Sequence, residues 1–161
     1  MLRVTAAIYE AMRTHGEETY PHECCGVLLG RSDGGVNTVE AAVRAANTRT
    51  DSAHNRYSIA PQELIKIQRE GREHGWDIVG FYHSHPDHPA HWSSTDFAEA
   101  HWLGCSYVIT SVAGSVARQT NSFLLTGSSE EAKSLEVEGI QITGKAPEYA
   151  EAEEALRSVP A

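Results

Sequence analysis

WDIVGFYHSHP, residues 76–86, is the stretch that decides both the fold and the place of the chemistry. Its apolar, β-branched and aromatic residues predict a central β-strand. The strand is expected to end between His83 and His85, because Pro86 has no N–H to donate to a sheet. Since successive strand side chains point to opposite faces, His83 and His85 leave the same face and Ser84 the other. Two imidazoles on one face can bind one metal ion.

The segments before this strand predict a helix, a hairpin and a second helix. Apolar residues recur at helical spacing over residues 4–15, so we expect an amphipathic helix that Gly16 and Pro21 limit. Residues 25–31 and 36–46 flank an Asp-Gly-Gly turn and predict a β-hairpin. Pro61 fits the first turn of a second helix that ends near Gly75.

The segments after the central strand predict a short helix and several strands. The helix covers residues 94–102, with Phe97, Ala98 and Trp102 facing inward. The expected strands are residues 105–111, 116–119, 122–125 and 135–143. Together these elements predict one domain over residues 1–143 that combines helices and strands, an α/β fold in the broad sense and α+β in the narrow one. Residues 144–161 are predicted to be an acidic tail that is either a solvated helix or disordered.

Composition excludes several classes of protein. The 161 residues are 40% hydrophobic and 22% charged, as expected for one globular domain. The net charge of −9 disfavours a nucleic-acid partner. We expect a cytoplasmic protein that binds no membrane, because the sequence has no secretory or membrane-spanning stretch. Three cysteines, Cys24, Cys25 and Cys105, make a poor disulfide framework and are expected to be buried thiols.

A third metal ligand is needed to complete a catalytic zinc site, which commonly has three protein ligands and an open position. Asp96 is the candidate, because a helix that begins after the loop can turn its carboxylate toward the two histidines. Ser93 and Asp96 also fit a second interpretation, in which Ser93 or Ser94 is the N-cap of that helix and Asp96 the acid of its first turn. His88 and His91 are expected to be exposed loop residues.

One competing zinc motif is present. Residues 83–88 match the H-x-H-x-D-H pattern of metallo-β-lactamase hydrolases. That family needs further histidine ligands downstream and a longer chain, whereas this sequence has no histidine after His101. We therefore interpret the match as accidental.

The full spacing resembles a different family. The sequence contains His83-x-His85, then seven residues, Ser93, two residues and Asp96, and it has Glu23 upstream. This spacing reproduces the upstream Glu and H-x-H-x7-S-x2-D of the JAMM, or MPN-plus, zinc metalloproteases. The resemblance runs from the first helix to about residue 126. It implies the MPN fold, a cytidine-deaminase-like mixed β-sheet flanked by helices.

The resemblance also implies a role for each residue of the pattern. His83, His85 and Asp96 are implied as the ligands of Zn²⁺. Glu23 is implied as the acid and base that holds the metal-bound water, and Ser93 as a hydrogen-bond donor to the oxyanion.

The implied reaction is hydrolysis of a peptide or isopeptide bond after the C-terminal Gly-Gly of a ubiquitin-like protein. A short chain without long insertions is typical of compact prokaryotic members, which implies a ubiquitin-like sulfur-carrier protein as the partner. Two alternatives stay open: a non-catalytic MPN scaffold that only binds partners, and a zinc amidase for a small molecule. The sequence contains no indication of an oligomeric state.

Overall fold

A computed structural model describes residues 1–49 and 56–144, which form helices and strands in mixed order along the chain. The predicted acidic tail lies, apart from Gly144, outside the described residues. The helices are α1 (Ala6–Thr19), α2 (Pro61–Glu73) and α3 (Ser94–Glu99). The strands are β1 (Leu2–Thr5), β2 (Cys25–Asp33), β3 (Val36–Ala45), β4 (Asp77–Pro86), β5 (Ser106–Ala113), β6 (Val116–Thr126), β7 (Ser134–Glu138) and β8 (Ile140–Thr143).

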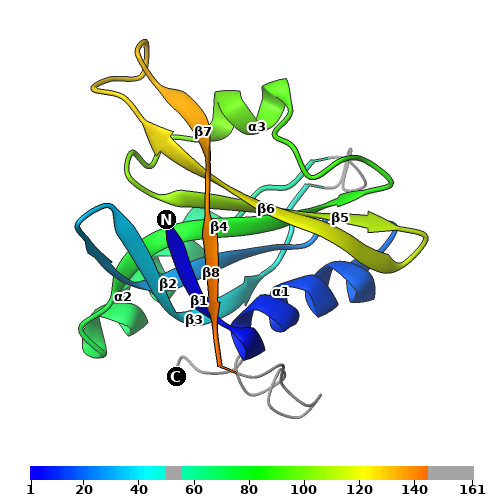
Figure 1. The fold of residues 1–161 in the computed structure, drawn as a ribbon, viewed down its shortest axis with the longest axis horizontal. Coiled ribbons are helices and arrows are strands. Elements are labelled where there is room, and N and C mark those ends of the chain that lie inside the picture. Colours follow the sequence, from blue (N-terminus) through cyan, green and yellow to red (C-terminus); the bar gives the residue numbers. More distant parts are fainter. Residues whose placement is uncertain (50–55, 145–161) are drawn as a thin grey trace.

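All described strands belong to one mixed sheet, in the order β7-β6-β5-β4-β2-β3-β1-β8. The predicted central strand, β4, is antiparallel to β2 and parallel to β5. β7 and β8 follow one another in the chain, separated by Gly139, although they occupy opposite edges. The sheet therefore curls until its edges come together, and β7 and β8 run as one line across the molecule (Figure 1).

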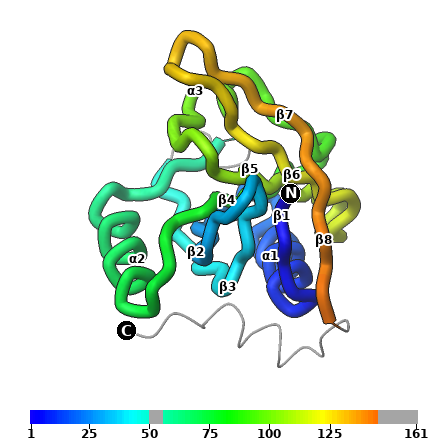
Figure 2. Tube along the Cα trace, turned by 60° about the vertical axis from the view of Figure 1, so that its left-hand side comes forward, coloured from blue at the N-terminus to red at the C-terminus, as the bar shows by residue number. Residues whose placement is uncertain are grey.

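Helices cover both faces of the sheet and create two apolar cores. α1 contacts β3 to β6, whereas α2 contacts β2 and β4 from the opposite side (Figure 2). One core contains Ile67 of α2 and Phe81 of β4, and the other contains Met12 of α1 and Tyr82 of β4. This mixed sheet flanked by helices is the predicted fold class. Because side chains along a strand alternate between the two faces of the sheet, His83 lies on the same face as Phe81, and Ser84 on the same face as Tyr82.

The beginning of the chain differs from the prediction. Residues 2–5 form a strand between β3 and β8, with Leu2 and Val4 buried, and the helix begins only at Ala6. Thr5 is its N-cap, because the Thr5 hydroxyl accepts a hydrogen bond from the N–H of Ile8 at 3.2 Å. Val4 satisfied the helical spacing by coincidence, since an apolar residue every second position fits a strand equally well.

Four other boundaries differ. The predicted strands 116–119 and 122–125 are one strand, β6, and the predicted strand 135–143 is divided at Gly139 into β7 and β8. The helix predicted over 94–102 ends at Glu99, and Ala98 is exposed rather than inward. β4 extends to Pro86, where β5 is its neighbour and the N–H of Asp87 donates to Val112 O at 2.7 Å. Pro86 is tolerated because the pairing with β2 has already ended at His83.

No helix within the described ranges is long and apolar enough to cross a membrane.

Candidate metal centre

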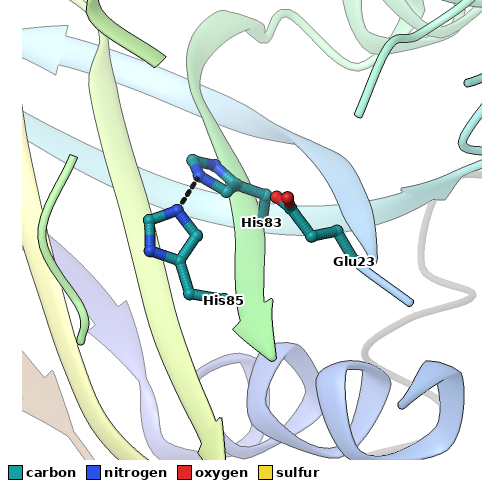
Figure 3. A group of neighbouring side chains, drawn as sticks. All are labelled: Glu23, His83 and His85. Atoms are coloured by element: carbon teal, nitrogen blue, oxygen red, sulfur yellow. Dashed lines mark hydrogen bonds between the residues drawn. The ribbon is translucent and has the colours of Figure 1, made fainter. Parts of the chain in front are cut away.

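The pairing of β2 with β4 brings Glu23 next to the two histidines. Cys25 lies opposite His83, and the N–H of Ser84 donates to Cys24 O at 3.3 Å. The Ser84 hydroxyl accepts in turn from the N–H of Cys24 at 2.8 Å. One residue further along this antiparallel pairing, Glu23 reaches the end of β4, with its carboxyl group beside the imidazoles (Figure 3). The sheet thus joins segments that are sixty residues apart in the chain.

Three side chains converge on one point at the end of β4. The Nε2 atoms of His83 and His85 are 3.1 Å apart, and Asp96 places Oδ1 3.3 Å from the first and Oδ2 3.0 Å from the second. A tetrahedral zinc with bonds of about 2.0–2.1 Å separates neighbouring ligand atoms by about 3.3 Å. Two imidazole nitrogens and one carboxylate, spaced in this way, fit a zinc ion.

The surroundings fix the orientation of both imidazole rings. His85 donates from Nδ1 to Pro89 O at 2.9 Å, so that in the neutral ring the lone pair of Nε2 is directed at the centre. Tyr57 stacks on His83, with ring centroids 4.5 Å apart and planes at 27°. Both contacts were missed by sequence reasoning, and no signal could have found them, because they depend on the path of two loops.

In the metal-free protein, electrostatics favour an ionised Asp96 and a neutral His83, whereas the pKa of His85, which burial alone would lower, is raised by hydrogen bonds with Asp96 and Pro89 O. Burial alone would raise the pKa of Asp96, but hydrogen bonds with His83, His85 and the N–H of Ser93 hold this pKa far below its usual range. Burial lowers the pKa of His83, so its imidazole is neutral at physiological pH. An ionised carboxylate beside a neutral imidazole is a pair of ligands suited to a divalent cation.

Ser93 and Asp96 form a capping box at the start of α3. The Ser93 hydroxyl accepts from the N–H of Asp96 at 3.1 Å, and the N–H of Ser93 donates to Asp96 Oδ2 at 2.9 Å. The capping interpretation of these residues is therefore confirmed, with Ser93 as the N-cap. It is compatible with the metal interpretation, because the same capping geometry presents Asp96 to the histidines and leaves the hydroxyl proton of Ser93 free for another acceptor.

Glu23 is nearly enclosed, with 3% of its surface exposed. One ligand atom from each of Glu23, His83 and His85 lies within 4.8 Å of the others, and Glu23 Oε1 has no hydrogen-bond partner among the described residues. Burial, opposed by His85 and reinforced by Asp96, raises the pKa of Glu23 to about 8. The carboxyl group can thus hold or release a proton near neutral pH, which is what a general acid and base must do.

A pocket of about 400 Å³ opens onto this group of residues. Its wall includes Glu23, His85 and Ser93, with Arg56, His88 and His91 among the other lining residues. His88 and His91 are exposed, as expected, and take no part in the contacts among His83, His85 and Asp96. The pocket gives a substrate access to the centre.

The cysteines are unsuited to nucleophilic catalysis. Cys24, Cys25 and Cys105 are free and buried, as predicted. Burial raises the pKa of the Cys24 and Cys105 thiols to about 12 and that of Cys25 further still, so all three stay protonated.

Two named proteins are similar to this chain in sequence. A desampylase from Haloferax volcanii is 40% identical over 94 residues, which cover 58% of this chain and 66% of the desampylase. A "Probable TtuB-protein conjugate cleaving protease" from Thermus thermophilus is 31% identical over 114 residues, covering 71% of this chain and 72% of that protein.

Solved structures share the fold. A solution structure of a protein from Desulfitobacterium hafniense superposes with a TM-score of 0.76 at 29% identity, covering 90% of this chain and 94% of that one. The crystal structure of a JAB1/MPN domain protein from Archaeoglobus fulgidus superposes with a TM-score of 0.51 at 12% identity, covering 89% and 98%. The second likeness bears on the fold alone, which is the predicted MPN fold.

The model of one protein family matches residues 5–125, three quarters of the chain and all of the residues described above as the candidate centre. The family is described as prokaryotic homologues of the JAB domain. This chain belongs to that family.

Proposed function

We propose that this protein is a zinc-dependent hydrolase that cleaves a peptide or isopeptide bond after the C-terminal Gly-Gly of a ubiquitin-like or sulfur-carrier protein. One observation carries the proposal. His83 and His85 present imidazole nitrogens 3.1 Å apart, the two carboxylate oxygens of Asp96 lie 3.3 Å and 3.0 Å from them, and a buried carboxyl group, Glu23, stands next to this group.

In this proposal His83, His85 and Asp96 hold the zinc, which supplies Lewis-acid activation of water at neutral pH. Glu23 takes a proton from the attacking water and delivers it to the nitrogen of the leaving group. Its position beside His83 and His85, at the wall of the pocket, supports both halves of this transfer. Ser93, at the wall of the pocket, donates a hydrogen bond from its hydroxyl to the oxygen on which negative charge develops.

The substrate class rests on the relatives. The name of one relative states cleavage of TtuB-protein conjugates, and the other is called a desampylase. From these names we infer that the partner of this protein is a ubiquitin-like modifier. The modifier is either joined to another protein or carries residues beyond its Gly-Gly. Glycines suit a bond that must approach buried groups, because they have no side chain to exclude. The free thiols fit a reducing compartment, and we propose the cytoplasm.

Cleavage of a sulfur-carrier protein extended beyond its Gly-Gly, followed by intact mass, tests this function. The samples are wild type, wild type with a zinc chelator, Glu23→Gln, and Glu40→Gln as a control at an exposed position of β3. We expect wild type and Glu40→Gln to remove the extension, and Glu23→Gln to be slower by about 100-fold or more.

Other outcomes separate the alternatives. If zinc-loaded wild type leaves every carrier intact but hydrolyses small amides, the protein is an amidase and the proposed substrate class is wrong. If the protein binds no zinc and Glu23→Gln has no effect on any substrate, a non-catalytic scaffold replaces the proposal.

A further inference from the structure

The helix that carries Asp96 is too short to hold its own position. α3 has six residues, none of them buried, and helices of this length are unstable in isolation. The third ligand atom of the proposed centre therefore depends on what fastens α3 to the rest of the molecule. The capping box of Ser93 stabilises only the N-terminal end of the helix.

The C-terminal end of α3 is held by one lysine from a distant part of the chain. Lys133 directly precedes β7, and α3 lies beside the hairpin formed by β6 and β7 (Figure 1). Its ammonium group donates to Ala100 O at 2.9 Å, to Ala98 O at 3.4 Å and to Glu130 Oε1 at 2.8 Å. All three N–H groups of the ammonium are thus used, two of them on backbone carbonyls at the helix end.

The Lys133 contact has the features of a specific clamp. Its side chain is only 7% exposed, and Nζ lies 5.0 Å from the centre of the Phe97 ring, one residue after Asp96. A cation at a helix C-terminus also interacts favourably with the helix dipole. Arg49 also pairs with Glu99 of this helix, but the two side chains are 26% and 49% exposed, where ion pairs contribute little.

We propose that Lys133 is a positioning residue for the metal centre: by binding the C-terminal carbonyls of α3, it holds Asp96 at the distance from His83 and His85 that zinc requires. The inference rests on the proposed metal centre and adds to it a residue outside the H-x-H-x7-S-x2-D pattern. Lys133 touches neither metal nor substrate and acts through the backbone of α3.

The test compares Lys133→Met with Lys66→Met. Methionine keeps an apolar stem over Phe97 and removes all three donors. Lys66 is the matched control, because its side chain is 73% exposed on α2 and, among residues 1–49 and 56–144, forms an ion pair only with Glu70 on the same helix. Two quantities are measured: the Kd of zinc, by competition with a chromophoric chelator, and amide hydrogen exchange of the metal-free protein.

We expect Lys133→Met to weaken zinc binding about tenfold or more and to accelerate exchange in residues 94–100, while β2 and β4 keep wild-type exchange. Lys66→Met should match wild type in both. Unchanged zinc affinity, or an acceleration spread evenly over the sheet, would overturn the proposal. If Lys133→Met does not fold, Lys133→Gln replaces it and should weaken zinc binding severalfold; wild-type affinity in that variant would overturn the proposal equally.

Failure of the metal centre and failure of the clamp give different results. Wild-type protein that binds no zinc refutes the centre itself. The exchange measurement needs no metal and still decides whether Lys133 holds α3.

Discussion

At the scale of single residues, Glu23 occupies a place that is unfavourable for its charge. Its carboxyl group is buried, and Oε1 lacks a hydrogen-bond partner in the described part of the chain. A buried carboxylate without a partner is destabilising. Conflicts of this kind between a residue and its environment are expected at functional sites, where the fold tolerates a local cost for chemistry.

Glu23→Gln is therefore expected to stabilise the metal-free protein at alkaline pH. The folded pKa of Glu23, about 8, exceeds the usual value of 4.5. Between these values the unfolded chain loses its proton while the folded protein keeps it, so wild-type stability falls as pH rises from 4.5 to 8. By pH 8 the variant should gain on the order of 4 kcal/mol relative to wild type.

Urea unfolding of chelator-treated protein at pH 5 and pH 8 measures this difference, with Glu40→Gln as the control. A stability gain of the same size at both pH values would contradict the raised pKa. So would a gain at pH 8 in the control.

The proposed ligands lie at positions that local periodicity determines, whereas Glu23, sixty residues from His83 in the chain, was implied only by the family resemblance. His83 and His85 share a face because a strand repeats every two residues, and Asp96 faces them because Ser93 caps its helix. Tyr57 and Lys133 escaped prediction for the opposite reason. Their contacts join segments far apart in the chain, and no pattern in the residues themselves specifies such neighbours.

At the scale of elements, β4 depends on a close approach to β5. A Cβ atom added to Gly80 would lie 2.4 Å from the backbone oxygen of Ser106, a distance that requires the backbone to move. Gly80 lies three residues before His83 in β4 and is paired with Ser106 of β5. The glycine is thus needed for strand packing, and the position of the ligand strand follows from it.

Gly80→Ala should lower the free energy of unfolding by about 3 kcal/mol, because backbone atoms on both strands must shift. Gly139→Ala is the matched control: its new Cβ would be 3.4 Å from the flexible end of Met1, at an exposed position, and should cost less than about 1 kcal/mol. Chemical denaturation measures both. Equal losses would show that the close contact with Ser106 has no special role.

Element boundaries were predicted well where a residue enforces them and poorly where pairing decides. Pro61 begins α2, and the Asp-Gly-Gly turn separates β2 from β3 as expected. The helix was predicted to begin at Val4, within β1, because two apolar positions in four residues fit either period. β6 was divided in two, since the polar residues around Asn121 interrupt the apolar pattern but not the pairing with β5.

At the scale of the whole molecule, the sheet closes on itself through β1 and β8. β1 pairs with β3 on one side and β8 on the other, and both pairings are parallel. Leu2 is completely buried within this arrangement. Neither pairing is adjacent in the chain, which is why the predicted fold class was correct while the strand order at this edge was beyond prediction.

Leu2→Ala should therefore destabilise the protein as a core substitution does, by about 2–5 kcal/mol. Val137→Ala on β7 removes an apolar side chain that is 75% exposed and should change stability by no more than about 0.5 kcal/mol. Thermal or urea unfolding compares the two. A small effect of Leu2→Ala would mean that β1 is not part of the cooperative core.

Anomalous diffraction at the zinc edge from zinc-loaded crystals locates the metal and identifies the atoms that hold it. We expect one peak within about 2.0–2.2 Å of His83 Nε2, His85 Nε2 and an oxygen of Asp96, with Glu23 outside bonding distance. A peak coordinated by Glu23 in place of Asp96, or no peak at the end of β4, would contradict this expectation.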